Sequence, residues 1–493
     1  MNKFSLDDTI AAVSTPLGEG GIGIVRVSGA RALEIADKIF VSKDGKKPSD
    51  YETYTIHYGH IIHRRGVVVE NDVSPRRCMT RDARRATRDE IIDEVLLTVM
   101  RAPKSYTKED IVEINCHGGI HTVKKALDLV VKHGARVAQP GEFTKRAFLN
   151  GRIDLTQAEA VLDVIRAKTE GSLKAAVGQL EGCLSKDVTC MLDALVGIAS
   201  HIEASIDFPD EELDIIKEES LEGKIAGILD KMKGLIDSFS EGVVLREGVL
   251  AVICGKPNVG KSSLMNLLLR RDRVIVAPIP GTTRDAVEEM ISLNGVPIRL
   301  VDTAGIGEVN DVLYKESSGR SKRYIEKADI VLLMLDASTE IDEEDLEIIR
   351  LVEGRKKLVI VNKIDLSTNT TPGVARPGVV GAAHLFKGDA VVEISVEKKI
   401  NIDLLERSIL DMVWSGKYIQ GEGAILTNAR HKELLDKALD NMLSVSKAVK
   451  DAMHPELIAV DLKEAVFNLG LIVGQSASDD ILDRIFENFC IGK

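Results

Sequence analysis

The chain has 493 residues, and its 65 basic and 77 acidic residues leave a formal net charge of −12. An acidic chain of this kind does not bind nucleic acid through its bulk charge. At roughly 150 residues per domain, the length predicts about three domains. Hydrophobic residues make up 44% of the chain and aromatic residues 4%, which excludes wholesale disorder and disfavours a nucleic-acid site built on rows of stacking rings.

The cysteines and the N-terminal residues bear on the compartment. The six cysteines show neither CxxC spacing nor a histidine cluster at metal-ligand intervals, which predicts a reduced, intracellular protein. The first residues lack the apolar stretch of a secretory signal, and no run approaches about 18 apolar residues. We therefore expect a cytoplasmic protein without a membrane segment.

Residues 1–120 predict an α+β domain. Short β-rich runs lie at 22–27, 55–62, 95–100 and 111–116, with glycines between them. The segment 71–90 contains six arginines and little apolar content, so we interpret it as a solvated loop.

The helical periodicity begins at residue 156. Thr156 and Glu159 have the spacing of a capping box, and apolar residues then recur at helical intervals up to residue 206. Residues 121–245 are therefore expected to form the first part of an all-α domain. Helical spacing returns after residue 418, and 419–493 are expected to complete this domain.

Residues 246–418 show the pattern of an α/β domain inserted between those helical parts. Continuous apolar runs at 249–254, 298–301, 330–335, 358–361 and 391–394 alternate with helical segments. Strands of this kind are buried on both faces, which predicts a doubly wound, parallel sheet.

A phosphate-binding loop follows the first of these strands. Gly255 to Ser262 fits G-x-x-x-x-G-K-[ST] between a strand and a helix. Backbone amides at a helix N-terminus can surround phosphate oxygens, Lys261 can reach the β and γ phosphates, and Ser262 can ligate Mg²⁺. The residues expected to touch the nucleotide here are Asn258, Val259, Gly260, Lys261, Ser262 and Ser263.

Further nucleotide elements follow in order. Asp302-Thr303-Ala304-Gly305 comes after a buried strand, where Asp302 can hold Mg²⁺ through water and the Gly305 amide can contact the γ-phosphate. Thr283 lies between the phosphate-binding loop and Asp302, and it can close over Mg²⁺ when a γ-phosphate is present. Together they predict a Ras-like P-loop domain.

The base specificity is carried by two later strand ends. Asn362-Lys363-Ile364-Asp365 follows one strand, and the Asp365 carboxylate can accept both N–H groups on the Watson–Crick edge of guanine. Ser395-Val396 follows the last strand, where a backbone N–H can reach guanine O6. The order of these motifs predicts a GTP site.

The hydrolytic residues depart from the Ras pattern. The position after Gly305 is Ile306, which cannot orient water by a hydrogen bond. Glu308 and Glu316 are the nearby carboxylates, and the residues alone do not choose between them. Asn258 can ligate a cation beside the β and γ phosphates.

These features together resemble the MnmE (TrmE) family of tRNA modification GTPases, within the TrmE-Era-EngA-like potassium-dependent GTPases. The similarity runs nearly end to end. Its marks are Asp8-Thr9-Ile10-Ala11-Ala12, Gly20 to Gly29, Pro140-Gly141-Glu142-Phe143, Arg146 to Asn150, Asp207 to Glu212 and Phe489-Cys490-Ile491-Gly492-Lys493.

The resemblance implies a homodimer that hydrolyses GTP and, with the FAD-dependent protein MnmG (GidA), forms a heterotetramer or larger complex. This complex would modify carbon 5 of the wobble uridine, U34, of certain tRNAs with aminomethyl or carboxymethylaminomethyl groups. The N-terminal domain would dimerise and bind 5,10-methylenetetrahydrofolate or 5-formyltetrahydrofolate. The implied cofactors are GTP, Mg²⁺, K⁺ and the folate.

The resemblance also implies roles for individual residues. Glu316 would orient the attacking water, with Lys261 and Thr283 in the catalytic set and Mg²⁺ held by Ser262 and Thr283. The folate would be contacted by Arg26, Glu113, Arg152 and Lys493. Potassium would be held by Asn258 and the segment Ala277, Pro278, Ile279, Pro280, Gly281 and Thr282, with Asn258, Ala277, Ile279 and Thr282 as ligands.

Three points stay open. Cys490 is either catalytic or a positional residue near the folate. The segments 71–90 and 367–390 resemble insertions relative to the family and have no assigned role, and Ala277 offers only a backbone oxygen in the potassium loop. The competing function is a ribosome-assembly or regulatory GTPase that binds RNA without modifying it. Such proteins usually append an RNA-binding module, whereas helices follow the α/β domain here.

Overall fold

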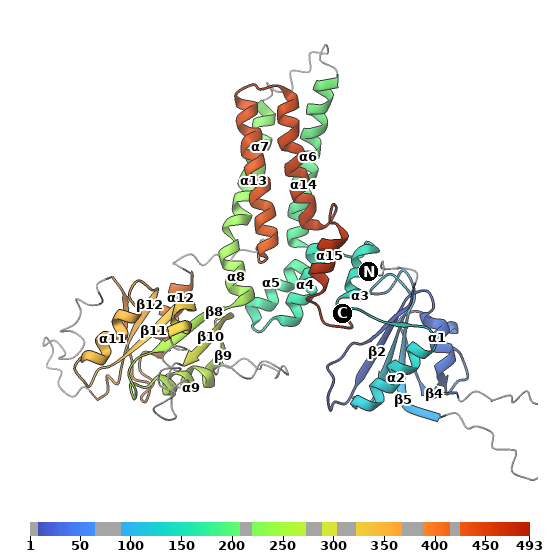
Figure 1. Cartoon of the computed structure of the whole chain (residues 1–493), viewed down its shortest axis with the longest axis horizontal. Helices are drawn as coiled ribbons and strands as arrows, with labels where there is room; N and C mark the ends of the chain where they lie inside the picture. The colour runs from blue at the N-terminus through green and yellow to red at the C-terminus, as the bar shows by residue number, and fades with distance from the viewer. Residues whose placement is uncertain are drawn as a thin grey trace, which may run out of the picture. The chain divides into compact units, whose positions relative to one another are not determined.

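The computed structural model describes residues 8–64, 90–207, 219–272, 288–302, 322–366, 386, 388–414 and 424–493 (Figure 1). The chain divides into two compact units, one formed by residues 1–159 and 473–493 and the other by residues 160–472. Nearly all of the arginine-rich segment 71–90 and most of the segment 367–390 lie outside the described residues.

The first unit is built on a mixed sheet of seven strands in the order β3-β4-β5-β6-β2-β1-β7. Helices α1 (Ala32–Ile39) and α2 (Ile120–Lys132) pack on one face, where Val27, Leu97 and Ile114 are buried. This is the predicted α+β architecture. The strands are β1 (Ile10–Val13), β2 (Gly23–Ser28), β3 (Phe40–Ser42), β4 (Thr55–His63), β5 (Glu90–Met100), β6 (Ile111–Cys116) and β7 (Arg136–Val137).

Among the described residues, the other face of this sheet is covered at one end. Helix α3 (Glu142–Leu149) places Phe143 against Ile10 and Ala12. On the β4–β5 pair, the alternating side chains that point away from α1 and α2 include Ile56, Tyr58 and Leu96, and all three are exposed. Strand alternation therefore gives this unit an apolar sheet face beside α3.

The packing divides the chain differently from the expected domains at two places. The boundary at residue 120 falls at the start of α2, whose Val123 and Val130 belong to the same core as the strands. At the other end, the division into compact units groups residues 473–493 with the first unit. Helix α15 (Asp479–Phe486) packs against α3. A hydrophobic period identifies a helix but does not say against which layer its apolar face packs.

The predicted capping box is also displaced. Helix α4 runs Leu155–Arg166, so Thr156 already lies within it. The reciprocal bonds are made two residues earlier: the Gln157 amide donates to Asp154 Oδ1 at 3.0 Å, and the Asp154 amide donates to Gln157 Oε1 at 3.1 Å. Aspartate is as good an N-cap as threonine, and its carboxylate also favours the positive end of the helix dipole.

The second unit contains long helices that run side by side (Figure 1). Helix α13 packs against α7, and Lys463 of α14 pairs with Glu203 of α6 at 2.9 Å. Helices from both sides of the α/β segment therefore pack against one another. The helices are α5 (Glu170–Leu180), α6 (Cys183–Asp207), α7 (Glu219–Asp237), α8 (Phe239–Glu247), α13 (Ala429–Lys450) and α14 (Pro455–Val473).

The stretch Glu170–Asp207 is long and apolar enough to cross a membrane by length and composition alone. Its residues nevertheless divide into two faces. Leu184, Val188 and Leu195 are buried, whereas Lys186 and Asp187 are exposed. This division is typical of an amphipathic bundle helix.

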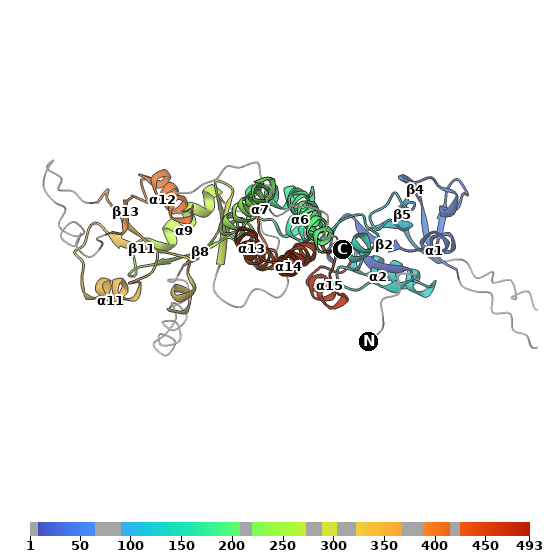
Figure 2. The same cartoon turned by 90° about the horizontal axis from the view of Figure 1, so that it is seen from above.

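The same unit contains a six-stranded sheet in the order β13-β12-β11-β8-β10-β9. All pairs are parallel except β9–β10, an antiparallel edge that the sequence did not predict. Figure 2 shows helices on both sides: α9 and α12 cover one face, α11 the other. The elements are β8 (Val249–Cys254), α9 (Lys261–Asp272), β9 (Glu288–Leu293), β10 (Val296–Asp302), β11 (Ile330–Asp336), α11 (Glu343–Leu351), β12 (Lys357–Asn362), β13 (Ala390–Glu393) and α12 (Ile402–Trp414).

Candidate functional site

The loop between β8 and α9 has the conformation that its glycines predict. Gly255 has φ 148°, and a Cβ there would lie 2.4 Å from the Met334 carbonyl oxygen of β11. Asn258 and Gly260 also have positive φ, 64° and 104°. These values are accessible to glycine and, less often, to asparagine, so the loop can turn tightly at the carboxyl end of the sheet.

Lys261 and Ser262 point along this loop. The buried Lys261 ammonium donates to the carbonyls of Gly255 at 2.9 Å and Lys256 at 2.7 Å. The Ser262 hydroxyl donates to Asp302 Oδ2 at 2.6 Å. A hydroxyl and a carboxylate thus meet at the start of α9, and hard oxygen donors of this kind suit Mg²⁺.

Asn362 joins the phosphate loop to the base-binding side. Its Nδ2 donates to the Val259 carbonyl at 2.8 Å, and its Oδ1 accepts from the Val396 amide at 3.1 Å. One buried amide side chain therefore holds together three segments that are far apart in sequence. The parallel topology makes this possible, because the carboxyl ends of β8, β12 and β13 lie at one edge.

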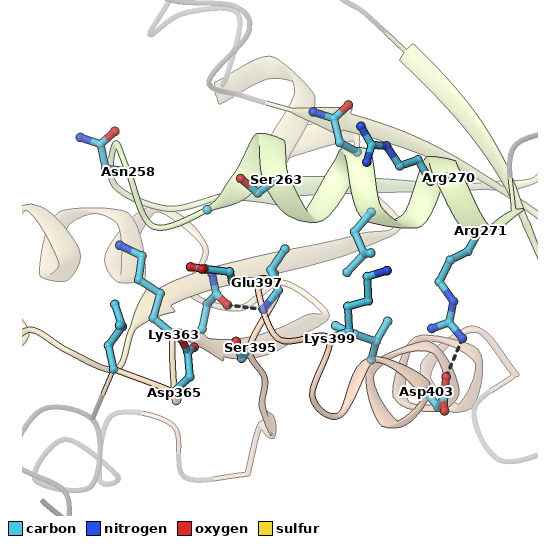
Figure 3. Close-up of a pocket in the computed structure, with 17 residues that line it drawn as sticks. Asn258, Ser263, Arg270, Arg271, Lys363, Asp365, Ser395, Glu397, Lys399 and Asp403 are labelled. Atoms are coloured by element: carbon cyan, nitrogen blue, oxygen red, sulfur yellow. Dashed lines mark hydrogen bonds and ion pairs between the residues drawn. The ribbon is translucent and has the colours of Figure 1, made fainter. Parts of the chain in front are cut away.

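A cavity of about 920 Å³ opens beside these segments (Figure 3). Asp365 and Ser395 line one part of it and Asn258 another, and the hydrogen-bonded Asn362 and Val396 also line it. The predicted residues that line the cavity are Asn258, Gly260, Ser263, Asn362, Lys363, Asp365, Ser395 and Val396.

Several predicted site residues lie outside the described part of the chain. They are Ala277, Pro278, Ile279, Pro280, Gly281, Thr282, Thr283, Thr303, Ala304, Gly305, Glu308 and Glu316. Their assignments stay predictions.

Two charged groups at this site escaped the motif analysis. Asp336, at the end of β11, pairs with Lys363 at 2.6 Å. Burial raises the pKa of Asp336, but the hydrogen bonds from Lys363 and Ser338 and the charge of Lys363 together outweigh burial, so the pKa is lowered. Asp336 ends a strand whose neighbour carries the guanine motif, and this position could have indicated from the sequence that Asp336 lies at the site.

The second group is Lys256, inside the loop itself. Its ammonium lies 2.7 Å from both Asp342 Oδ2 and Asp345 Oδ2. Burial lowers the pKa of Lys256, but the two carboxylates raise it by more. The partners are more than eighty residues away in the chain, so no local pattern indicates this pair.

Three of the residues expected to bind folate, Arg26, Glu113 and Arg152, lie around Tyr106 in the first unit. The Arg26 guanidinium is 2.7 Å from Glu113 Oε1, as cross-strand neighbours on β2 and β6. The Tyr106 ring lies under both Arg26 and Arg152, at 5.8 and 4.7 Å from guanidinium carbon to ring centre. Tyr106 carries no motif, and the sequence analysis missed it.

The C-terminal residues reach this cluster. The Gly492 carbonyl accepts from Arg26 Nη1 at 3.4 Å and from Ser14 Oγ at 3.2 Å, and Ile491 bridges to Pro140. The exposed Cys490 lies in this segment. By contrast, burial raises the pKa of Cys116 to about 12, which keeps that thiol protonated and unreactive at neutral pH.

A buried charge network underlies the cluster. Arg146 is 2% exposed and pairs with Asp8 at 2.5 Å, Glu109 at 3.0 Å and Glu142 at 3.2 Å. Arg136 supports the same carboxylates, at 2.7 Å from Asp8 and 2.6 Å from Glu142. Because every group in the network has a partner of opposite charge, these otherwise costly buried ions are tolerated.

Comparison with known proteins covers the whole chain. A family model described as the GTP-binding protein TrmE N-terminus matches residues 9–152, and one described as the MnmE helical domain matches residues 155–490. A protein from Alkaliphilus metalliredigens named tRNA modification GTPase MnmE is 46% identical over 497 residues, covering 99% of this chain and 100% of the relative. Its counterpart from Alkaliphilus oremlandii is 44% identical over 490 residues, with the same coverage.

Among solved structures, Aquifex aeolicus Era bound to GDP and aluminium fluoride is 29% identical over 40% of this chain and 67% of that chain, with a TM-score of 0.27.

Proposed function

The chain belongs to the MnmE family of tRNA modification GTPases. From this premise we propose which ligand each of its two compact units binds. It hydrolyses GTP and acts in the modification of the wobble uridine of tRNA. The similarity over 99% of the chain carries this conclusion, and it disfavours the alternative of a ribosome-assembly GTPase. The finer proposal is that the first unit binds a one-carbon folate and the sheet of the second unit binds GTP.

The GTP site is assigned to the cavity beside Asn258 and Asp365. Lys261 would leave the two loop carbonyls to contact the β and γ phosphates, and the amides from Val259 to Ser263 would surround them. The Ser262–Asp302 contact supports a Mg²⁺ position at this point. A bound Mg²⁺ would neutralise charge on the phosphates. Thr283 and Glu316 are proposed to complete the site, with Glu316 orienting water.

Guanine is assigned to the Asp365 and Ser395 end of the cavity. The bond from the Val396 amide to Asn362 fixes the Ser395-Val396 segment at this end of the cavity, where a backbone N–H would donate to guanine O6. Asp365 would accept the two donors of the base edge.

A monovalent cation is proposed beside the phosphates, with Asn258 as the side-chain ligand and the segment 277–282 supplying the other oxygens. Asn258 lines the cavity, and its φ of 64° is a left-handed conformation that asparagine adopts more readily than most residues. A cation at this position would offset the charge that develops between the β and γ phosphates, as an arginine does in other GTPases.

Replacing K⁺ by Na⁺ in the assay is expected to slow GTP turnover by about a hundredfold, as loss of one preorganised charge does. Steady-state phosphate release at equal ionic strength measures this. Asn258→Ala should lower the rate in K⁺ and leave the rate in Na⁺ unchanged. Equal wild-type rates in the two salts would refute the cation site.

The folate is assigned to the surface formed by Arg26, Glu113, Arg152 and the C-terminal residues. A folate carries carboxylates that guanidinium groups can pair with, and an aromatic ring system that can stack on Tyr106 or a guanidinium plane. The Gly492 contacts of Arg26 and Ser14 support bringing Cys490 and Lys493 to the same place. Cys490 is proposed as a positional residue.

The assembly is proposed to be a homodimer joined through the first unit. The exposed Ile56, Tyr58 and Leu96 on its sheet face support this, since contiguous apolar surface commonly marks an interface. We propose tRNA and the FAD-dependent protein MnmG as partners of this dimer, and the cytoplasm as its location. The α/β sheet is proposed to form a domain inserted into the helical domain.

Cells lacking this protein are expected to lose the modified wobble uridines, and the wild-type gene to restore them. Arg26→Met should fail to restore them, because loss of a charged hydrogen bond weakens folate binding by about 1.5–3 kcal/mol, at least about tenfold. Nucleoside analysis of bulk tRNA and calorimetry with 5-formyltetrahydrofolate measure the two effects. The matched control is Lys38→Met on α1, which covers the opposite sheet face.

Fully modified tRNA in the deletion strain would contradict the function itself. Unchanged folate affinity in Arg26→Met would contradict only the folate assignment.

A further inference from the structure

Lys256 joins the phosphate loop to a helix that no nucleotide motif includes. Its side chain is 14% exposed and contacts Asp342, the N-cap of α11, and Asp345, three residues later. Asp342 is 58% exposed, but the Asp345 side chain is 5% exposed. The ion pair between Lys256 and Asp345 is therefore largely buried, and solvent screens it less than an ion pair on an open surface.

The two carboxylates are themselves fixed by the start of the helix. Asp342 Oδ1 accepts from the Asp345 amide at 3.2 Å, and Asp345 Oδ2 accepts from the Asp342 amide at 3.2 Å. This reciprocal capping box holds both acidic side chains in one orientation before Lys256 approaches. Lys256 consequently meets a rigid partner, and little additional side-chain entropy is lost in forming the contact.

The backbone of Lys256 is part of the phosphate-binding apparatus. Its carbonyl is one of the two that hold the Lys261 ammonium. The preceding Gly255 is pressed against the Met334 carbonyl, with no room for a Cβ. The loop is thus held on one side by β11 and on the other by the Lys256 side chain, and Lys261 depends on the position of both.

We infer that Lys256 is a positioning residue for the nucleotide: its ion pairs with Asp342 and Asp345 anchor the phosphate loop to α11 and order the loop before GTP binds. This inference rests on the assignment of the loop as the phosphate site. The proposed role affects nucleotide binding more than the chemical step, because an ordered loop stabilises the bound ground state and the transition state equally. Such uniform stabilisation changes KM and leaves kcat unaltered.

Lys256→Met in the full-length protein is expected to raise the KM for GTP and the Kd for GDP about tenfold, which corresponds to about 1.4 kcal/mol, with kcat changed less than about twofold. Lys256→Arg should retain most of the affinity, since a guanidinium can also pair with both carboxylates. In the nucleotide-free protein, the amides of residues 255–260 should exchange faster in Lys256→Met while the strands of the sheet keep their protection.

The matched control is Glu343→Gln, which removes a carboxylate from the same first turn of α11. Glu343 is exposed and pairs only weakly with Arg350, at 3.8 Å, so its KM should equal that of the wild type. Asp342→Asn is the second variant: asparagine caps a helix as well as aspartate does but lacks the charge. Its effect should lie between those of the control and Lys256→Met, which tests the contact even where Lys256→Met folds poorly.

Three results separate the possible failures. If Lys261→Ala loses nucleotide but Lys256→Met and Asp342→Asn bind GDP like the wild type, the positioning role is overturned and the site assignment stands. A fall in kcat at unchanged KM in Lys256→Met also overturns it, since that assigns the residue to the chemical step. If Lys261→Ala itself keeps full GDP affinity, the loop is not the phosphate site and both proposals fall.

Discussion

Asp365→Asn is expected to weaken GTP binding by about 3 kcal/mol, or roughly a hundredfold in Kd, and to make xanthosine triphosphate the preferred nucleotide. The carboxylate accepts both donors of guanine in the proposed arrangement. An amide presents a donor where the guanine amino group also donates, whereas xanthine has a carbonyl oxygen at that position. The variant therefore reverses the hydrogen-bond pattern without changing the size of the side chain.

Competition between the two nucleotides, measured by calorimetry and by hydrolysis rates, checks this result. Asp403→Asn is the matched control, because Asp403 lines the same cavity but pairs with Arg271 at 2.8 Å. It should keep the preference for GTP. An Asp365→Asn protein that still prefers GTP would contradict the guanine assignment and not the family.

Arg146→Met is expected to lower the free energy of unfolding of the first unit by about 3–5 kcal/mol, because removing one partner of a buried ion network leaves uncompensated charge. Arg146 has the central place: it contacts Asp8, Glu109 and Glu142, and the Glu142 side chain is fully buried. Arg136 would then face the acidic groups alone, and it is 40% exposed.

Urea denaturation followed by hydrogen exchange of β1 and β2 would measure the loss within this unit of a multidomain chain. Arg31→Met is the control, an exposed arginine paired with Glu34 three residues away; solvent screens such a pair, so its loss should change stability little. Equal stability of the two variants would show that the buried network does not hold β1 and α3 together.

The sequence predicted most of the nucleotide site. Gly255 to Ser262, Asp302 and Asn362 were recognisable because each motif is short and follows a strand, and because parallel strands bring their carboxyl ends to one edge. The antiparallel edge β9 was missed, since short apolar runs do not reveal their pairing direction.

At the first unit the sequence was less informative. Arg26 and Glu113 were chosen through the family resemblance, and their pairing on β2 and β6 follows from the register of two strands. Tyr106 has no motif, and only the fold places its ring under two guanidinium groups. Single aromatic residues carry no periodic signal, so such positions are invisible before the chain is folded.

The sequence by itself determined the features that depend on neighbouring residues: the strand and helix periods, the phosphate loop, the guanine motif and the family. Only the tertiary structure decided the contacts between distant segments, such as Lys256 with Asp342 and Asp345, Asp336 with Lys363, and the return of the C-terminal residues to the first unit. The physical reason is the range of the interactions. Backbone geometry and hydrophobic period act over a few residues, whereas ion pairs and layer packing depend on which segments the topology brings together.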